Sequence, residues 1–189
     1  MKTIGELLEG TLNLTRQGLL ESAFSPVCDA LNQTAEKIYQ GELSAEPPFQ
    51  RFIKDNWRLI KFMGIPNADS VPANLPFGVR RAVASLNMPN LDQEIVIYIV
   101  RQILHTRRFP PEIAFHKTTK ITVEEEKLLF PNSLIFALIG CVVFNPINKD
   151  ETISDICWIN IRGFQMFISE LWGRNDLAER IMNLYSVKR

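Results

Sequence analysis

The feature that most constrains the fold of this sequence is an apolar run without a charge, residues 134–144. It is eleven residues long and lies between Asn132 and the pair Asn145-Pro146. A helix that crosses a bilayer needs about 20 apolar residues, so this run predicts the centre of a folded core. We expect a fully buried helix capped by Asn132 or Ser133. Its valine and isoleucine content keeps a buried strand open as the alternative.

Helical spacing dominates the rest of the chain, because apolar residues recur three and four positions apart. The pattern predicts a mainly α fold, a single-domain helical bundle of about seven helices. The first helix bends near Gly10 or Gly18, and the second begins at Ser25-Pro26, where a hydroxyl cap precedes a proline. The predicted ranges are 4–24, 26–39, 48–63, 79–86, 90–105, 134–144, 153–172 and 176–185.

Residues 95–100 permit two interpretations. All six are β-branched or aromatic, which favours a buried strand. However, Asn90 is a capping residue with Gln93 three positions later, and the pattern continues unbroken to His105. We therefore expect a central, mostly buried helix here.

One segment alternates with the period of a strand. Residues 112–116 and 120–124 carry Ile113, Phe115, Ile121 and Val123 on one face, with Lys117-Thr118-Thr119 between them. This pattern predicts a small β-hairpin near residues 112–124, and we expect it to be the only sheet.

The chain has 189 residues, which suits one domain spanning residues 1–189. The only candidate seam is a long loop at residues 64–78, which contains Pro66, Pro72 and Pro76 and a single charge, Asp69. Its apolar residues favour a packed surface loop over a flexible linker.

The composition, with 46% apolar and 22% charged residues, is typical of a soluble globular protein. Residues 1–10 lack the basic start and apolar run of a secretory signal. The cysteines Cys28, Cys141 and Cys157 are odd in number and lie in apolar surroundings, which favours reduced core thiols. We expect a cytoplasmic protein that does not associate with membranes.

Charge is unevenly placed along a chain whose total is zero. Residues 51–120 carry eleven Lys or Arg against five Asp or Glu, a net charge of +6, whereas residues 1–50 carry −4 and residues 121–189 carry −2. A basic block points to an anionic partner, unless the acidic segments fold over it and neutralise it. The candidate contact residues are Arg51, Lys54, Arg58, Lys61, Arg80, Arg81, Arg101, His105, Arg107 and Arg108.

Motifs for chemistry are few. The glycines form neither a dinucleotide fingerprint nor a phosphate-binding loop, and no histidine or cysteine pair has metal spacing, so we predict no cofactor and no metal. Arg101 and His105 share one helical face and could bind a phosphate with Arg108. Glu124 and Glu126 could chelate a divalent ion in an extended segment, although a charge run more often marks a solvated end.

Three functions follow from these patterns. The first is a non-catalytic binding or regulatory protein that recognises a protein partner, or itself, through a mixed-charge surface with a basic central strip. The second is a nucleic-acid-binding protein using the basic residues of 51–120, which a pI near 6.7 disfavours. The third is a small enzyme with dispersed residues around Arg101 and His105. The sequence favours the first and a function without catalysis.

Overall fold

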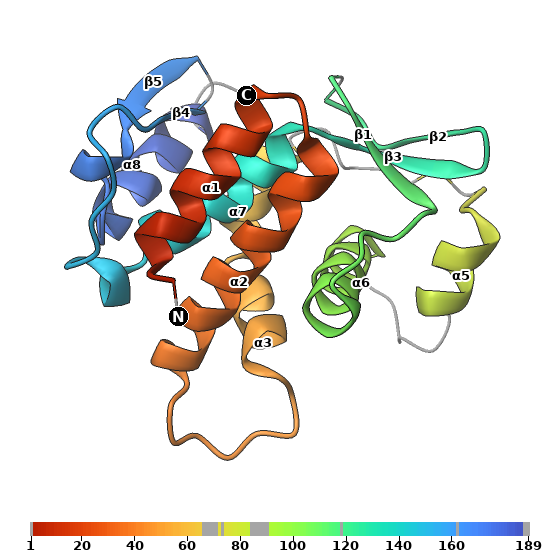
Figure 1. Cartoon of the computed structure of the whole chain (residues 1–189), viewed down its shortest axis with the longest axis horizontal. Coiled ribbons are helices and arrows are strands. Elements are labelled where there is room, and N and C mark those ends of the chain that lie inside the picture. The colour runs from red at the N-terminus through yellow and green to blue at the C-terminus, as the bar shows by residue number, and fades with distance from the viewer. Residues whose placement is uncertain are drawn as a thin grey trace.

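The computed structural model describes residues 2–65, 72, 74–83, 91–117, 119–161 and 163–186. Within these ranges the protein is mainly helical, as predicted, with eight α-helices and two small sheets (Figure 1). The helices are α1 (Ile4–Arg16), α2 (Leu20–Ile38), α3 (Pro48–Asp55), α4 (Trp57–Gly64), α5 (Phe77–Val83), α6 (Leu91–Thr106), α7 (Ser133–Val143) and α8 (Asn175–Ser186). The strands are β1 (Ile113–His116), β2 (Thr122–Glu124), β3 (Lys127–Pro131), β4 (Trp158–Ile161) and β5 (Phe164–Phe167).

The apolar run at 134–144 forms α7, the predicted buried helix, at the centre of the molecule. It packs closely on α4, because glycines remove side-chain volume at the crossing. A Cβ on Gly64 would lie 2.7 Å from the Ala137 Cβ, and one on Gly140 would lie 2.6 Å from the Met63 Sδ. Asn132 makes no side-chain cap bond, and the Ser133 hydroxyl instead donates to the Gly64 carbonyl at 2.7 Å.

The first two helices divide differently from the prediction. α1 ends at Arg16, because Gly18 reverses the chain with a φ of +78°, and α2 begins at Leu20 rather than at Ser25-Pro26. Pro26 therefore lies inside α2. The buried residues of α2 from Ala23 to Ala35 form one continuous stripe against α1 and α7. The stability gained from this packing outweighs the loss of the backbone hydrogen bond that a proline cannot donate.

The predicted helix 48–63 is two helices, α3 and α4, separated at Asn56. The Asn56 side chain donates to the Phe52 carbonyl at 2.9 Å, a local bond that competes with helical continuation. α6 confirms the helical interpretation of residues 95–100, and α8 confirms the last predicted helix. α5 covers part of the predicted helix 79–86, whose residues 84–86 lie outside the described residues, as do 66–71 and 73 of the predicted loop.

The first sheet contains the two predicted strands but pairs them differently. β3 lies between them in the order β1-β3-β2, parallel to β1 and antiparallel to β2. The hairpin is thus β2–β3, and the predicted pairing of 112–116 with 120–124 is wrong. Residues 127–131 form the central strand, because the side chains of Leu128 and Phe130 are fully buried there.

The predicted helix 153–172 is wrong. This segment forms the antiparallel hairpin β4–β5 followed by a short 3-10 helix (Ile168–Glu170), so this second sheet also corrects the expectation of a single one. Buried residues alternate at Cys157, Ile159 and Ile161, and Gly163, with a φ of +92°, provides the tight connection. Period-two burial and a turn glycine therefore override the helical spacing.

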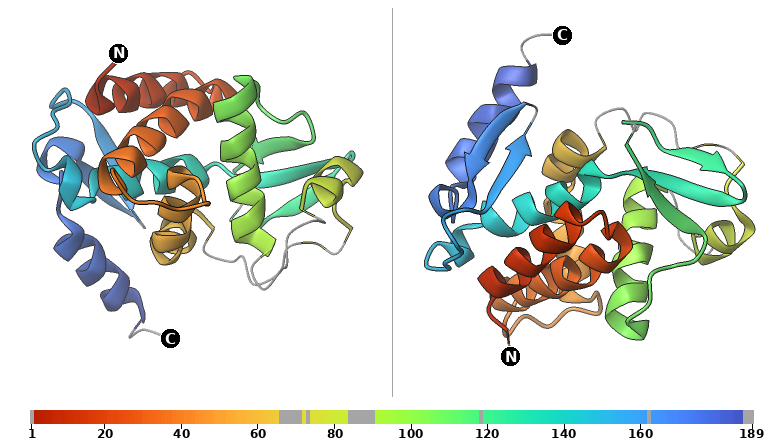
Figure 2. Two further views of the ribbon diagram at one scale, coloured as in Figure 1. Left: turned by 90° about the horizontal axis from the view of Figure 1, so that it is seen from below. Right: turned by 45° about the horizontal axis from the view of Figure 1, so that its top comes forward.

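Figure 2 shows how these parts are arranged. α5, α6 and the three-stranded sheet lie on one side of the central helices, and β4, β5 and α8 lie on the other. Phe24 of α2 stacks on Phe115 of β1 with ring centroids 5.1 Å apart, which joins the helices to the first sheet. Among the described residues no helix has the length and apolarity needed to cross a membrane.

Two buried contacts hold the segment after α7 in place. The Asn148 side chain, fully buried, donates to Thr34 Oγ1 at 3.0 Å and to the Val142 carbonyl at 2.8 Å. Gly5 in α1 meets the Thr152 backbone so closely that a Cβ there would lie 1.8 Å from the carbonyl oxygen. These contacts fix the path of the chain into β4.

Candidate functional site

Half of the predicted basic contact residues form ion pairs with the protein's own carboxylates. Their partners come from several parts of the chain, so the acidic segments do fold over much of the basic block. The pairs are Arg51–Glu42 at 2.7 Å, Lys54–Glu46 at 2.5 Å, Arg58–Glu179 at 3.3 Å, Lys61–Asp92 at 3.5 Å and Arg107–Asp29 at 2.5 Å.

Of the remaining basic residues, two form hydrogen bonds within the chain. Arg101 donates to Gln50 Oε1 at 2.8 Å, which ties α6 to α3, and Arg80 donates to the Leu75 carbonyl at 3.2 Å. His105, Arg81 and Arg108 are exposed. Arg101 and His105 lie four residues apart on α6, and the Arg101 guanidinium is engaged with Gln50 of α3.

The glutamate run lies at the β2–β3 turn, where Glu125 and Glu126 occupy left-handed conformations with φ of 47° and 62°. Both line a pocket of about 630 Å³ together with Glu112 and Phe77. In the described part of the chain, no group of three or more His, Cys, Asp or Glu side chains is placed to hold a metal ion.

The three cysteines are free and buried. Burial raises the pKa of the Cys28 and Cys141 thiols far above the usual value, so neither supplies a reactive thiolate at neutral pH. The prediction of reduced core thiols is confirmed for all three.

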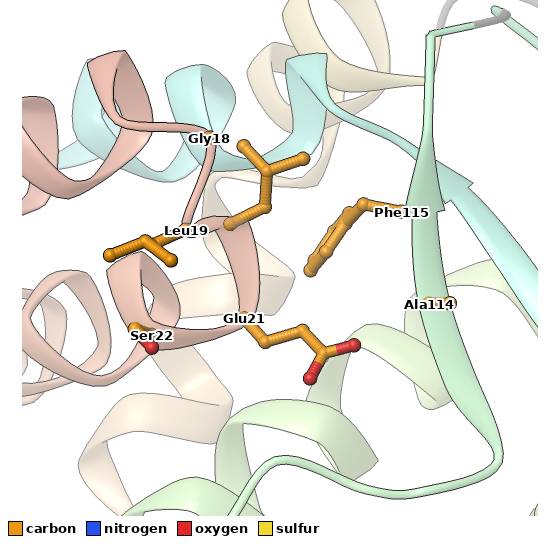
Figure 3. A pocket seen from close by; sticks show the side chains of 7 residues that line it. Gly18, Leu19, Glu21, Ser22, Ala114 and Phe115 are labelled. Atoms are coloured by element: carbon orange, nitrogen blue, oxygen red, sulfur yellow. The ribbon is translucent and has the colours of Figure 1, made fainter.

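A pocket of about 340 Å³ opens between the start of α2 and β1 (Figure 3). Glu21 and Phe115 point toward the same space from these two elements. The other side chains of its lining are apolar or, at Ser22, a hydroxyl. The only polar side chains among these lining residues are the Glu21 carboxylate and the Ser22 hydroxyl, with no histidine or cation beside them.

The hairpin β4–β5 carries an exposed aromatic face that the sequence interpretation missed. Trp158 lies opposite Phe167, and they are 39% and 43% exposed. The Ile168 amide donates to the Cys157 carbonyl at 3.0 Å, so by alternation Trp158 and Phe167 form a non-hydrogen-bonded pair, in which side chains lie closest. The next outward pair is Asn160 with Gln165, and both are exposed.

One further apolar side chain extends this surface, because Ile156, just before β4, is 69% exposed. Phe164 at the turn is also exposed, at 60%, but it pairs with Ile161, so by alternation it lies on the opposite face of the hairpin from Trp158 and Phe167. We call Ile156, Trp158 and Phe167 the hairpin patch. The alternation of residues 157–161 was the sequence signal that could have revealed it, since it assigns Trp158 to the face opposite Ile159.

Comparison with known proteins places this chain in a family. A family model described as Rv1289 matches residues 3–189. The chain belongs to the Rv1289 family. It is 24% identical over 189 residues to "Uncharacterized protein Rv1289" of Mycobacterium tuberculosis and to "Uncharacterized protein Mb1320" of Mycobacterium bovis, and each match covers 96% of this chain and 89% of the relative. No solved structure matches it.

In this Rv1289-family chain, the surface chemistry differs between the two areas described. Around α3 and α4, cations meet carboxylates of the same chain, which reduces their attraction for an external anion. On the hairpin patch, large apolar side chains face outward from a short sheet. The patch is therefore the feature best suited to association with another protein.

Proposed function

We propose that this chain is a non-catalytic binding or regulatory protein that recognises a protein partner through the hairpin patch. The single observation that carries the proposal is the outward-facing Trp158–Phe167 pair, with the exposed Ile156 just before β4. Clusters of exposed apolar side chains on a folded surface mark interaction sites more often than scattered ones do.

The chemistry of the face defines the partner. The outward side chains of β4 and β5 are Trp158, Asn160, Gln165 and Phe167, and none is charged. Such a face fits an apolar protein surface with a few hydrogen-bonding groups. These four described side chains offer no cation for a phosphate backbone, on which nucleic-acid binding depends.

The predicted basic strip contributes less to this proposal than the sequence suggested. Arg51, Lys54, Arg58 and Lys61 are each paired within the chain, and the neighbouring carboxylates cancel much of their positive potential. No observation favours nucleic-acid binding or catalysis over protein binding. The proposed setting is the cytoplasm, which three unpaired cysteines support.

The test is quantitative capture of a partner by the full chain. The variant carries Trp158→Ser and Phe167→Ser, and the matched control is Leu43→Ser, because Leu43 is fully exposed away from the hairpin. We expect the double variant to lose roughly tenfold or more of each captured protein, since buried aromatic residues dominate binding energy, and the control to lose none.

Light scattering of the same three proteins identifies self-association. A wild-type dimer that becomes a monomer only in the double variant would make a second copy the partner. Equal capture by wild type and double variant, with no change of oligomeric state, would contradict the proposal. Melting curves for each protein ensure that loss of binding is not loss of folding.

A further inference from the structure

A pocket of about 500 Å³ lies between α6 and the segment that follows it. Tyr98, Gln102 and Thr106 line it from α6 and are spaced four residues apart, so they share one face of the helix. The following segment contributes Arg108 and Glu112. This volume is within the range of small-molecule sites, about 300–1,000 Å³.

The pocket contains two opposite charges that do not pair with one another. Within the described residues, neither Arg108 nor Glu112 takes part in an ion pair. The neighbouring Arg107 differs, because it contacts Asp29 at 2.5 Å. A free guanidinium and a carboxylate without an ionic partner thus line the same space.

Hydrogen bonds hold the carboxylate in place. The Tyr98 hydroxyl donates to Glu112 Oε1 at 2.5 Å, and the Gln102 amide donates to the Tyr98 hydroxyl at 3.5 Å. Burial, with the bond to Glu112, raises the pKa of Tyr98 to about 12, so the hydroxyl keeps its proton at neutral pH. A carboxylate fixed in this way is preorganised for a ligand.

We propose that this pocket binds a small zwitterion, an α-amino acid, whose carboxylate contacts Arg108 and whose ammonium group contacts Glu112. Glu112 disfavours a simple anion, and Arg108 disfavours a simple cation. A molecule that carries both charges close together satisfies both side chains through charge-assisted hydrogen bonds. α6, which contributes Tyr98, Gln102 and Thr106 to the pocket, lies on the side of the molecule away from β4–β5 (Figure 1), so this proposal is independent of protein binding at the hairpin patch.

The first experiment screens the full chain against each of the standard amino acids by thermal unfolding and measures the affinity of those that stabilise it by calorimetry. A ligand that binds only the folded state raises the unfolding temperature. The N-acetyl and carboxamide forms of the same amino acid are the chemical controls. Each lacks one charge, and we expect each to bind about tenfold more weakly or worse.

The second experiment tests the two side chains separately. Arg108→Gln removes the cation, and Glu112→Gln removes the anion while its amide oxygen can still accept the Tyr98 proton. Arg81→Gln is the matched control, because Arg81 is exposed on α5 and does not line the pocket. We expect each pocket variant to weaken binding about tenfold or more and the control to bind like wild type.

Four results would overturn the proposal. They are no binding of any amino acid to the wild-type chain, equal binding of the blocked forms, wild-type affinity in both pocket variants, and equal stabilisation by inorganic phosphate alone.

Discussion

The contact between α1 and the segment that leads into β4 predicts opposite effects for two glycine-to-alanine substitutions in one helix. A Cβ at Gly5 would lie 1.8 Å from the Thr152 carbonyl oxygen, whereas a Cβ at Gly10 meets nothing within 4 Å. Alanine is favoured over glycine by about 1 kcal/mol in a helix interior, and less near its start. Because a backbone oxygen cannot rotate away, Gly5→Ala also incurs an overpacking cost of about 1–3 kcal/mol.

We therefore expect Gly5→Ala to lower the free energy of unfolding by about 1–3 kcal/mol and Gly10→Ala to raise it by about 0.5–1 kcal/mol. Urea unfolding followed by circular dichroism measures both. With a denaturant dependence of about 2 kcal/mol per molar, Gly5→Ala moves the midpoint down by roughly 0.5–1.5 M. A Gly5→Ala protein at least as stable as wild type would refute the close approach of α1 to Thr152.

Three further effects follow from changes at single residues. Asn148→Ala leaves the buried Val142 carbonyl without its side-chain donor. We expect urea unfolding to show that the free energy of unfolding falls by about 2–3 kcal/mol. A fall below about 0.5 kcal/mol would contradict the role of this hydrogen bond. Gly163→Ala places a side chain at a φ of +92° in open space, so the expected loss is about 1 kcal/mol from backbone strain alone, and an unchanged melting temperature would argue against this turn. For Tyr98, a pKa raised from 10.0 to about 12 means that its contribution to stability is present below pH 10 and lost as the pH rises to about 12. Wild type should lose stability over that window relative to Tyr98→Phe, and parallel curves would show that folding does not raise the pKa of Tyr98.

The sequence predicted the helical class and the elements with long, continuous apolar patterns. α7 and α6 were recognised because their buried stripes persist over several turns. α8 was recognised from the spacing of its apolar residues, although only Ala178 and Met182 of its described side chains are buried. α2 was misplaced because a proline after a serine is a common helix start, and only the packing of Ala23 and Phe24 against neighbouring elements shows that the helix begins earlier.

The hairpin β4–β5 shows why local spacing can mislead. Ile161, Phe164 and Ile168 have the spacing of a helical face, but only Ile161 and Ile168 are buried, and Phe164 is exposed. The turn at Gly163, supported by the Asn160 side chain at 2.8 Å, decides the structure. The exposed aromatic pair was missed through the same error, since Trp158 and Phe167 were both assigned to one helix, 153–172, and not to paired strands.

Ion pairing was only partly predictable. Glu42 and Glu46 lie close in sequence to Arg51 and Lys54, so these two local ion pairs could have been predicted from the sequence. Glu179 is 121 residues from Arg58, and the fold alone brings them together. The pocket that Tyr98 and Arg108 both line likewise depends on the path of the chain after α6, which the sequence does not reveal.

The central claim is that the outer face of β4–β5 contacts a protein, and site-specific photo-crosslinking in the native cell tests it most directly. A photoreactive residue at Gln165 lies on that face beside the Trp158–Phe167 pair, and one at Leu43 is an exposed control. We predict a discrete protein adduct from position 165 that is absent from position 43 and lost when Trp158→Ser is added. No adduct at 165, or the same adducts from both positions, would contradict the claim.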